Sequence, residues 1–586
     1  MRMLISFFRV HLHGFFLPTM HREEKMDADD TITIEDVTSN HVELHAPMHS
    51  LWAAQLALPR DASVTDAALE DASVRTWMDA NALLSGGSTF AWQIFSHPTA
   101  NVDLLKARQQ AIKALPTSLK KHLLQLRGTE MDVLWLFSLP TLEEAPSLQL
   151  LFPHTPFIRF INYSSTALSL FHVYRGYLAP IMPFLGPCTT VAGPYLYMRR
   201  NLGMPITIAA YVRMLVTMAR VIGKPSGNVK QDLVKLGSVV LYGIMFVLGV
   251  MQSVQLAKTV RTLRRGVMKR LDALRSFVAT TAAVQQTVPV GVWQAFGIAP
   301  PGRPVVIPPG IRGMHVLLTN GAIRAELEAT LKRMYVLDAA CMMRKPGMCF
   351  AKYATDTHPF ILNMGHLALG RNQVRNPMCL RKNLIITGPN AGGKTTYVRA
   401  ICANVLLAQT FGVAVAKAAV MTPYHNFSSF MRIADTLGNA SLFEAEARRC
   451  ADIIDMVERA ASRGERSIVF LDEPMHSTPP IEGASTSMSV IEHIGRLPGT
   501  RVIATTHYFS ITELASQRSA HFQNVSMEAI PMANGFSFPY KIRNGPSFQC
   551  IALELLQDSN LPERVITRAM EWKNKLCARE VRINDR

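Results

Sequence analysis

The sequence predicts an α/β domain in the C-terminal half of the chain, preceded by a mainly α-helical region. Three apolar stretches rich in β-branched residues predict strands of the α/β domain, because each is followed at once by polar or glycine-rich residues. These stretches are Leu384–Thr387, Ser467–Leu471 and Arg501–Thr505. Apolar residues at helical spacing over 46–139 and 259–291 predict the helical region.

A glycine-rich loop follows the first stretch. Residues Gly388–Thr395, GPNAGGKT, fit the phosphate-binding pattern GxxxxGK(S/T) without a mismatch, and a helix is predicted over Thr396–Leu407. A strand, a glycine loop and a helix in this order point backbone N–H groups at phosphate. We expect Lys394 to reach the β- and γ-phosphates of ATP and the Thr395 hydroxyl to ligate Mg²⁺. The expected nucleotide contacts are Gly388, Pro389, Asn390, Ala391, Gly392, Gly393, Lys394, Thr395 and Thr396.

Acidic residues and a histidine follow the other two predicted strands. Asp472 and Glu473 end the second stretch and supply the acidic partner that a phosphate loop needs. We expect Asp472 to hold Mg²⁺, directly or through water, and Glu473 to orient and polarise the attacking water. His507 follows the third strand, where it can sense the γ-phosphate. A lone histidine is usually an ordinary satisfied side chain, and its place after a strand favours the functional interpretation.

Composition and charge limit the classes of partner. The chain has 586 residues, 48% hydrophobic and 18% charged, so it is long enough for about three domains and is not disordered. Its net charge of +18 suits nucleic acid or an anionic membrane, and a basic protein with neither partner is the alternative. The eight cysteines form no CxxC pair, which indicates a reducing compartment and no zinc site.

Residues 140–258 form a hydrophobic insertion that could enter a membrane. Segments 176–198 and 236–257 carry no charge and are long enough to cross a bilayer. The first contains Pro180, Pro183, Pro187 and Pro194. Prolines are expected to break a spanning helix, so the second segment is the better candidate. The basic loop 199–235 does not fit two full spans under the positive-inside rule, which leaves two interpretations: segments that dip into a membrane, or buried helices of a soluble domain.

A basic helix is predicted directly after this insertion. Spacings of three and four place several of its positive charges on one face, which suits either phosphate binding or an ordinary solvated face. The residues are Arg261, Arg264, Arg265, Lys269, Arg270 and Arg275.

Longer segments around these motifs resemble one known family. They are TGPNAGGKTTYVRA (Thr387–Ala400), LDEPMHSTPPIEG (Leu471–Gly483), ATTHYFSITEL (Ala504–Leu514), FMRIADTLGNASLFEAE (Phe430–Glu446) and FPYKIRNGPSFQCIALELL (Phe538–Leu556). Together they resemble the MutS-like mismatch-repair ATPases. The resemblance is strong over 335–575 and faint over 90–130, and nothing in 140–260 resembles the family.

The resemblance implies an ATP hydrolase with a P-loop NTPase fold of the ABC/MutS-like type, with ATP and Mg²⁺ as cofactors. It also implies a homo- or heterodimer of paired ATPase domains, in which Ser441 approaches the γ-phosphate of the opposite subunit. Gln373 or Val374 stands where an aromatic ring is expected under the adenine, and Tyr540 can supply one instead. Met475 and Ser477 replace two glycines of the family pattern, which predicts a stiffer segment and slower hydrolysis.

The function implied by this resemblance is a DNA-binding ATPase that acts in DNA mismatch repair, or in sensing DNA damage or structure, through ATP-driven dimer closure. The expected DNA is a duplex, mismatched or branched, although no mismatch-reading domain of the family type is visible before residue 335. One alternative is a membrane-anchored ATPase with a mechanical role that does not involve DNA. A transporter-type ATPase is less consistent, because its signature is missing between Phe411 and Ser467. All of these ATPases need ATP, so we expect the protein in an intracellular compartment that contains it: nucleus, cytoplasm or organelle, with membrane association possible.

The sequence divides into six predicted parts. They are a tail or targeting segment (1–45), a helical core (46–139), the hydrophobic insertion (140–258), basic helices with a proline-rich linker (259–334), the ATPase domain (335–575) and a C-terminal tail (576–586).

Overall fold

The computed structural model describes residues 56–584 apart from 140–145, 226–227, 355–357, 371, 432–441, 533–534, 550 and 557–560. Ser441 and the predicted tail 1–45 therefore lie outside the described residues. The chain forms two compact units. Unit 1 comprises residues 1–43, 135–272 and 307–321, and unit 2 comprises 44–134, 273–306 and 322–586. The predicted domain limits stay predictions.

Within the described residues, unit 2 contains a seven-stranded sheet, in the strand order β1-β9-β10-β11-β6-β12-β15. All neighbours are parallel except the last pair, β12 and β15. The strands are β1 (Ser63–Val64), β9 (Asn426–Phe430), β10 (Ser467–Asp472), β11 (Thr500–Thr505), β6 (Asn383–Thr387), β12 (Phe522–Met527) and β15 (Ile542–Asn544). The three strands predicted from apolar stretches are thus β6, β10 and β11, which lie side by side at the centre of the sheet.

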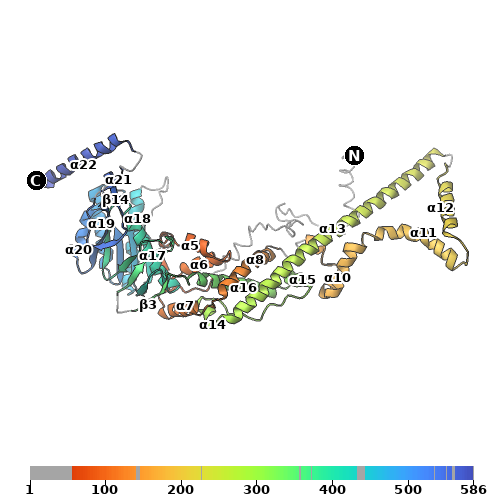
Figure 1. The fold of residues 1–586 in the computed structure, drawn as a ribbon, viewed down its shortest axis with the longest axis horizontal. Coiled ribbons are helices and arrows are strands. Elements are labelled where there is room, and N and C mark those ends of the chain that lie inside the picture. The colour runs from red at the N-terminus through yellow and green to blue at the C-terminus, as the bar shows by residue number, and fades with distance from the viewer. Residues whose placement is uncertain are drawn as a thin grey trace. The chain divides into compact units, whose positions relative to one another are not determined.

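Helices cover this sheet because its strands are apolar on both faces. Val469 and Leu471 of β10 pack into a cluster with α18 (Leu442–Ser462) and α19 (Pro480–Arg496). Ile468 and Phe470, which point the other way along the same strand, are equally buried. Helix α17 (Lys394–Thr410) contacts β10 and β11 and is buried along most of its length (Figure 1).

The N-terminal part of unit 2 packs on the part that contains the seven-stranded sheet. Strand β1 pairs with β9, and the side chain of Gln409 joins Tyr424 to Thr99 by accepting from Tyr424 N at 2.8 Å and donating to Thr99 O at 3.1 Å. Arg108 of α7 is buried and donates to the Thr410 carbonyl at 2.5 Å. Burial lowers the pKa of this arginine to about 10, an effect that Asp61 opposes. The helices of this part are α4 (Asp66–Asp71), α5 (Arg75–Asn81), α6 (Gly87–Phe95), α7 (Val102–Ala114), α8 (Leu119–Ser138), α14 (Val290–Ala295) and α16 (Gly321–Met342).

Two buried carboxylates fix the loop before α6 to the helices around it. Asp338 of α16 accepts hydrogen bonds from the N–H groups of Leu83 and Leu84, each at 2.9 Å. Glu130 of α8 accepts from the Ser85 N–H at 2.9 Å and from the hydroxyl of Tyr335 at 2.8 Å. The two acids therefore supply the backbone partners that this buried loop would otherwise lack.

Smaller elements complete unit 2. A second sheet has the order β3-β8-β4-β5, with β3 (Lys352–Tyr353), β8 (Ala418–Met421), β4 (Phe360–Met364) and β5 (Asn376–Cys379). Strand β2 (Cys349–Phe350) pairs with β7 (Val413–Ala414), and β13 (Ile530–Met532) pairs with β14 (Gly535–Ser537). The remaining helices are η3 (Phe509–Glu513), α20 (Leu514–Gln517), α21 (Ala552–Leu555) and α22 (Glu563–Asn584).

The described part of unit 1 is helical. Its elements are α9 (Pro146–Gln149), η1 (Arg159–Tyr163), α10 (Ser165–Val173), η2 (Tyr174–Leu178), α11 (Met182–Arg200), α12 (Ile208–Ile222) and α15 (Arg312–Thr319). Helix α13 (Val229–Thr287) begins in unit 1 and ends in unit 2. The expectation that prolines break the first hydrophobic segment is wrong for Pro187 and Pro194, because both lie inside α11. Each removes one backbone donor, and the helix continues past both.

The predicted basic helix is the middle of α13, and its charges do not all share one face. Arg261, Arg265 and Lys269 are exposed and follow one another at intervals of four residues, on one side of the helix. Arg270 is 9% exposed, and its guanidinium lies 4.4 Å from the centre of the Trp135 ring. Arg264 is half-buried. A phosphate-binding face on this helix is therefore narrower than the sequence predicts.

Candidate active site

The glycine loop lies between β6 and α17, and two of its glycines are required by close contacts. All five residues of β6 are buried, and α17 begins at Lys394. Gly388 has φ +142°, and a Cβ atom there would lie 2.0 Å from the carbonyl oxygen of Met527 in β12. Gly393 has φ +93°, and a Cβ atom there would lie 3.1 Å from the ring of Tyr540. The loop is thus fitted to its neighbours at a backbone conformation that favours glycine.

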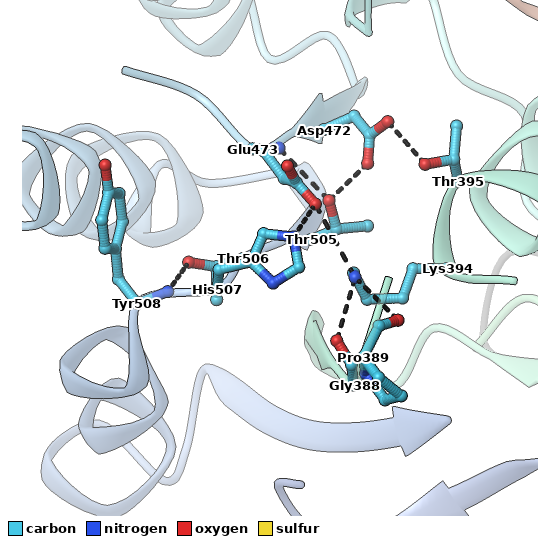
Figure 2. Close-up of polar contacts among 10 residues, drawn as sticks. All are labelled: Gly388, Pro389, Lys394, Thr395, Asp472, Glu473, Thr505, Thr506, His507 and Tyr508. Atoms are coloured by element: carbon cyan, nitrogen blue, oxygen red, sulfur yellow. Dashed lines mark hydrogen bonds and ion pairs between the residues drawn. The ribbon is translucent and has the colours of Figure 1, made fainter. Parts of the chain in front are cut away.

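Lys394 turns back over this loop. Its side chain is 5% exposed, and Nζ donates to the carbonyl oxygens of Gly388 at 2.9 Å and Pro389 at 3.3 Å (Figure 2). Glu473 Oε1 lies 3.7 Å from the same Nζ. Burial lowers the pKa of Lys394, while the carboxylates of Glu473 and Asp472 oppose that shift. An incoming phosphate could replace the loop carbonyls as the partner of this amino group.

Asp472 joins the ends of three elements. Its Oδ2 accepts a hydrogen bond from Thr395 Oγ1 at 2.8 Å, and its Oδ1 accepts one from the hydroxyl of Thr505 (Figure 2). Because β10 and β11 are parallel neighbours, their carboxyl ends bring Asp472 and Thr505 to the same edge of the sheet. The first turn of α17 supplies Thr395. These oxygens form a hard donor set of the kind that Mg²⁺ prefers.

Glu473 is held in an unusual backbone conformation and faces His507. Its φ is +53°, and its N–H donates to the carbonyl and hydroxyl oxygens of Thr505, each at 3.2 Å. His507 Nε2 lies 2.5 Å from Glu473 Oε1 (Figure 2). Burial raises the pKa of Glu473, but His507, Lys394 and His476 together outweigh it, so the pKa lies below its ordinary value. The carboxylate is therefore ionised at neutral pH.

The segment after Glu473 is anchored by Glu446 of α18, whose side chain is fully buried. Ser477 Oγ donates to Glu446 Oε2 at 2.6 Å, and His476 Nδ1 lies 2.7 Å from Glu446 Oε1. Met475, at φ +60°, is buried in the apolar cluster beneath the sheet. Met475 and Ser477, which stand where the family pattern has glycines, both contact other parts of unit 2, and the stiffer segment and slower hydrolysis stay predictions.

A pocket of about 1070 Å³ extends from the glycine loop. Among the predicted nucleotide contacts it is lined by Pro389, Asn390, Ala391, Gly393, Lys394, Thr395, Thr396 and Tyr540, and Glu473 also borders it. Gly388 and Gly392 face backbone carbonyls of the protein instead, those of Met527 and Pro389. Asp472 and His507 lie beyond the lining, in contact with Thr395 and Glu473. Ser441 lies outside the described residues.

Another part of the pocket lining comes from the loop 365–374, of which the sequence singled out Gln373 and Val374 but not His366. His366 is buried in this loop and accepts from Ala368 N at 3.1 Å, and burial lowers its pKa. Gln373 and Val374 both line the pocket, but the polar atoms of Gln373 bond back to the His366 backbone, whereas Val374 has an apolar side chain and is 39% exposed. Of the two positions named from the sequence, the apolar Val374 is therefore the one available to a base.

Asn376 places Tyr540 at the edge of the pocket. Its Nδ2 donates to the Tyr540 carbonyl at 2.8 Å, and its Oδ1 accepts from Ile542 N at 3.0 Å. Tyr540 has φ +52° and is 44% exposed, so its ring is accessible from the pocket. The sequence indicated Tyr540 but gave no sign that Asn376 holds it, since the two are 164 residues apart.

This arrangement of a glycine loop, a lysine, two acids and a threonine is the one that phosphate-binding sites of nucleotide-binding proteins have. Residues 384–577 match the family described as MutS domain V. A DNA mismatch repair protein MutS from Bacillus cytotoxicus (strain DSM 22905 / CIP 110041 / 391-98 / NVH 391-98) is 27% identical over 214 residues. The aligned region covers 36% of this chain and 23% of that protein. The chain is therefore MutS-like in this part and spans about a quarter of the length of that relative.

Proposed function

We propose that the chain is a MutS-like P-loop ATPase that binds ATP with Mg²⁺ and hydrolyses it at the glycine loop. One observation carries this proposal: Lys394, Thr395, Asp472 and Glu473 come from two distant segments and meet at one loop. The match to MutS domain V over the same residues supports it. ATP hydrolysis requires a compartment that contains ATP, whether nucleus, cytoplasm or organelle.

The residues present fit a magnesium ion. Thr395 and Asp472 offer oxygen ligands whose two nearest atoms are 2.8 Å apart, and Thr505 fixes the second carboxylate oxygen. A bound Mg²⁺ neutralises negative charge on the phosphates. Lys394 would add a second positive charge for the phosphates. The chain therefore supplies this charge as well as the oxygen ligands for the magnesium ion.

Glu473 is the proposed acceptor for the proton of the attacking water. It is ionised at neutral pH, and its Oε1 is fixed between His507 and Lys394. That leaves Oε2 as the oxygen able to orient a water molecule towards the γ-phosphate. His507 would hold the Glu473 carboxylate in place. Because His507 follows β11, it would also couple the presence or absence of the γ-phosphate to the position of that strand.

The hydrolysis test compares Glu473→Gln and Lys394→Ala with the parent chain. Glu473→Gln should keep ATP binding and slow turnover by about 100-fold or more, because the amide cannot accept the proton. Lys394→Ala should weaken ATP binding itself, because it removes the buried cation. The measurements are steady-state phosphate release and binding of a fluorescent ATP analogue. The control is Glu458→Gln, which alters an exposed Glu–His pair with His493 outside the site. Parental turnover in Glu473→Gln would show that the base is assigned wrongly.

We propose DNA as the macromolecular partner, with ATP-driven pairing of two ATPase domains as the coupling step. The MutS match supports both, and pairing through Ser441 in trans stays a prediction. On the chain itself, the exposed side of α13 that carries Arg261, Arg265 and Lys269 is the proposed contact with the phosphate backbone. Action on mismatched or branched duplexes in DNA repair is the finer part of this proposal.

The DNA test is an anisotropy titration of matched, mismatched and branched duplexes at two salt concentrations. Binding should weaken steeply with salt, and Arg265→Ala combined with Lys269→Ala should weaken all three duplexes about equally and reduce the salt slope. Arg459→Ala is the control, since Arg459 is equally exposed but lies on α18, where it pairs with Asp455. Absence of binding at low salt would remove DNA from the proposal while leaving ATP hydrolysis in place.

A further inference from the structure

Residues 182–256, called the arm below, expose most of the apolar side chains that the structure describes in them. The arm comprises α11, α12 and the first half of α13 (Figure 1). In α13, Val239, Val240, Leu241 and Tyr242 are 70%, 52%, 56% and 71% exposed. Four consecutive helical residues point in four directions, about 100° apart, so they sample the whole circumference. A protein surface that packs against one face of this stretch would therefore leave apolar side chains exposed on the other faces.

The second half of the same helix is built differently. Its buried residues recur at intervals of three and four, as in an amphipathic helix that packs on one side. They are Ala257, Val260, Leu263, Val267, Leu271 and Leu274. The burial pattern changes at Ala257, so the two halves of α13 have different surroundings. The second half packs against protein on one face. The first half needs surroundings that accept apolar groups on every face.

The length of the exposed stretch identifies the second environment. Residues 236–257 carry no charge and are flanked by Lys235 and Lys258. Twenty-two helical residues span about 33 Å, which matches the roughly 30 Å hydrocarbon core of a bilayer. Among the described residues, α13 is the one helix long and apolar enough to cross a membrane, and none of its most apolar part is buried.

Helix α11 is less apolar than the exposed stretch of α13 and is not a candidate span by its own composition, so a crossing by α11 depends on its contact with α13. Its 19 residues span about 28 Å, none of them is buried, and its charges are confined to Arg199 and Arg200 at the end. Its Phe184 ring contacts Phe246 of α13, with centroids 5.5 Å apart. Prolines inside a helix, which are costly in water, are common in membrane helices.

Helix α12 has the pattern of a helix that lies at a membrane surface. Arg213 and Arg220 are seven residues apart and share one face. Ile208, Val212 and Val216 are 66%, 50% and 47% exposed and, at a spacing of four residues, form an apolar stripe next to the two arginines. An apolar face beside arginines suits the boundary between headgroups and acyl chains.

We propose that the arm inserts into a lipid bilayer, with α11 and α13 crossing it and α12 lying on the far surface. This arrangement places the basic segment 199–235 across the membrane from unit 2, which the positive-inside rule disfavours. The length and exposure of α13 outweigh that rule here, because a helix that only dips into one leaflet would leave about half of its apolar stretch outside the hydrocarbon.

Unit 2 contains chain from before the arm and from after it, in residues 44–134 and 273–306. A compact unit lies on one side of a bilayer, so the chain must cross an even number of times. Helix α13 provides one crossing, and α11 provides the other.

The test is flotation of the detergent-purified full chain with phosphatidylcholine vesicles in about 0.5 M salt, where electrostatic binding is screened. The parent should float. Val240→Glu combined with Val247→Glu should reduce flotation by at least about 100-fold, because two charges would lie within the hydrocarbon. Both valines are exposed, at 52% and 54%, so the protein interior is unaffected.

The control carries the same two charges outside the arm. Val290→Glu combined with Val306→Glu alters residues that are 56% and 74% exposed, and it should float like the parent. Parental flotation of the arm variant would overturn the proposal. So would a parent that stays out of the vesicles and forms oligomers by light scattering, since a second copy would then cover the arm.

Trypsin added to intact vesicles tests the crossing. In vesicles with unit 2 outside, Arg213, Arg220 and Lys224 should be protected and should be cut only after detergent is added. Cleavage there at the same rate without detergent would show that the arm dips into one leaflet, which would overturn the two crossings.

Discussion

Unit 2 buries charged side chains, whereas unit 1 exposes apolar ones, and the two departures from the usual arrangement have different explanations. Lys394, Glu446 and Asp338 are 5%, 0% and 0% exposed, and each has polar partners within unit 2. Val239 and Tyr242 are 70% and 71% exposed, and their stretch of α13 turns apolar groups to every side. A buried charge with partners is explained by the chain itself, whereas exposed apolar groups on all sides call for a partner outside it.

The difference decides which experiment is informative in each unit. A substitution in a buried polar network changes the stability or turnover of the isolated protein, because both partners belong to the same chain. A substitution in the arm changes little until the partner is present. The predictions below test the first half of this comparison.

The largest expected effect on stability is at Asp338. Burial raises its pKa to about 6, despite the N–H groups of Leu84 and Leu83, and Glu130 adds to the rise. Because the folded-state pKa lies above the ordinary value, this group's contribution to the free energy of unfolding is full at low pH and is lost as pH rises through about 6. The loss is about 3 kcal/mol between about pH 4 and pH 7.

Asp338→Asn removes the titration while keeping an acceptor oxygen for the two N–H groups. The variant should therefore be more stable than the parent at pH 7 to 8, and the difference should vanish towards about pH 4. Urea unfolding across this pH range measures it. A difference between the two proteins that is independent of pH would contradict the assignment to Asp338.

A smaller effect on stability is expected at Glu446, together with an effect on turnover. Glu446→Ala removes the acceptor of Ser477 and should lower the free energy of unfolding by about 1–2 kcal/mol. The segment after Glu473 would lose its anchor, so turnover should fall by about 10-fold while ATP binding is kept. Glu444→Ala, at an exposed position on the same helix, is the control. Unchanged turnover in Glu446→Ala would show that the contacts of Glu446 with Ser477 and His476 are not needed for ATP hydrolysis.

The sequence predicted the centre of the candidate site because the signals there are local. Lys394 and Thr395 lie inside one short motif, and Asp472 and Glu473 lie at the end of an apolar strand, so neighbouring residues suffice to indicate them. The parallel order of β6, β10 and β11 then brings the ends of these segments together. Their roles in hydrolysis are part of the proposal.

The contacts that support the site could not be predicted in the same way. Glu446 and Ser477 are 31 residues apart, and Asn376 and Tyr540 are 164 apart, with no periodicity to relate them. The burial of Arg270 against Trp135 is likewise a tertiary contact that the charge pattern of one helix does not contain. Helix α11 shows the opposite case, in which a local signal was present but misleading. Proline lowers helix propensity, yet the helix continues past Pro187 and Pro194.

Strand β1 has a consequence for how the protein is made. Ser63 pairs with Asn426 across 363 residues of sequence, and Val64 pairs with Phe427. At a synthesis rate of about 5–20 residues per second, the N-terminal strand waits roughly 20–70 s before its partner leaves the ribosome. During that time its edge is open to other chains. A fragment that begins at residue 335 would leave β9 without this neighbour, so β1 caps one edge of the seven-stranded sheet and can do so only after β9 has been made.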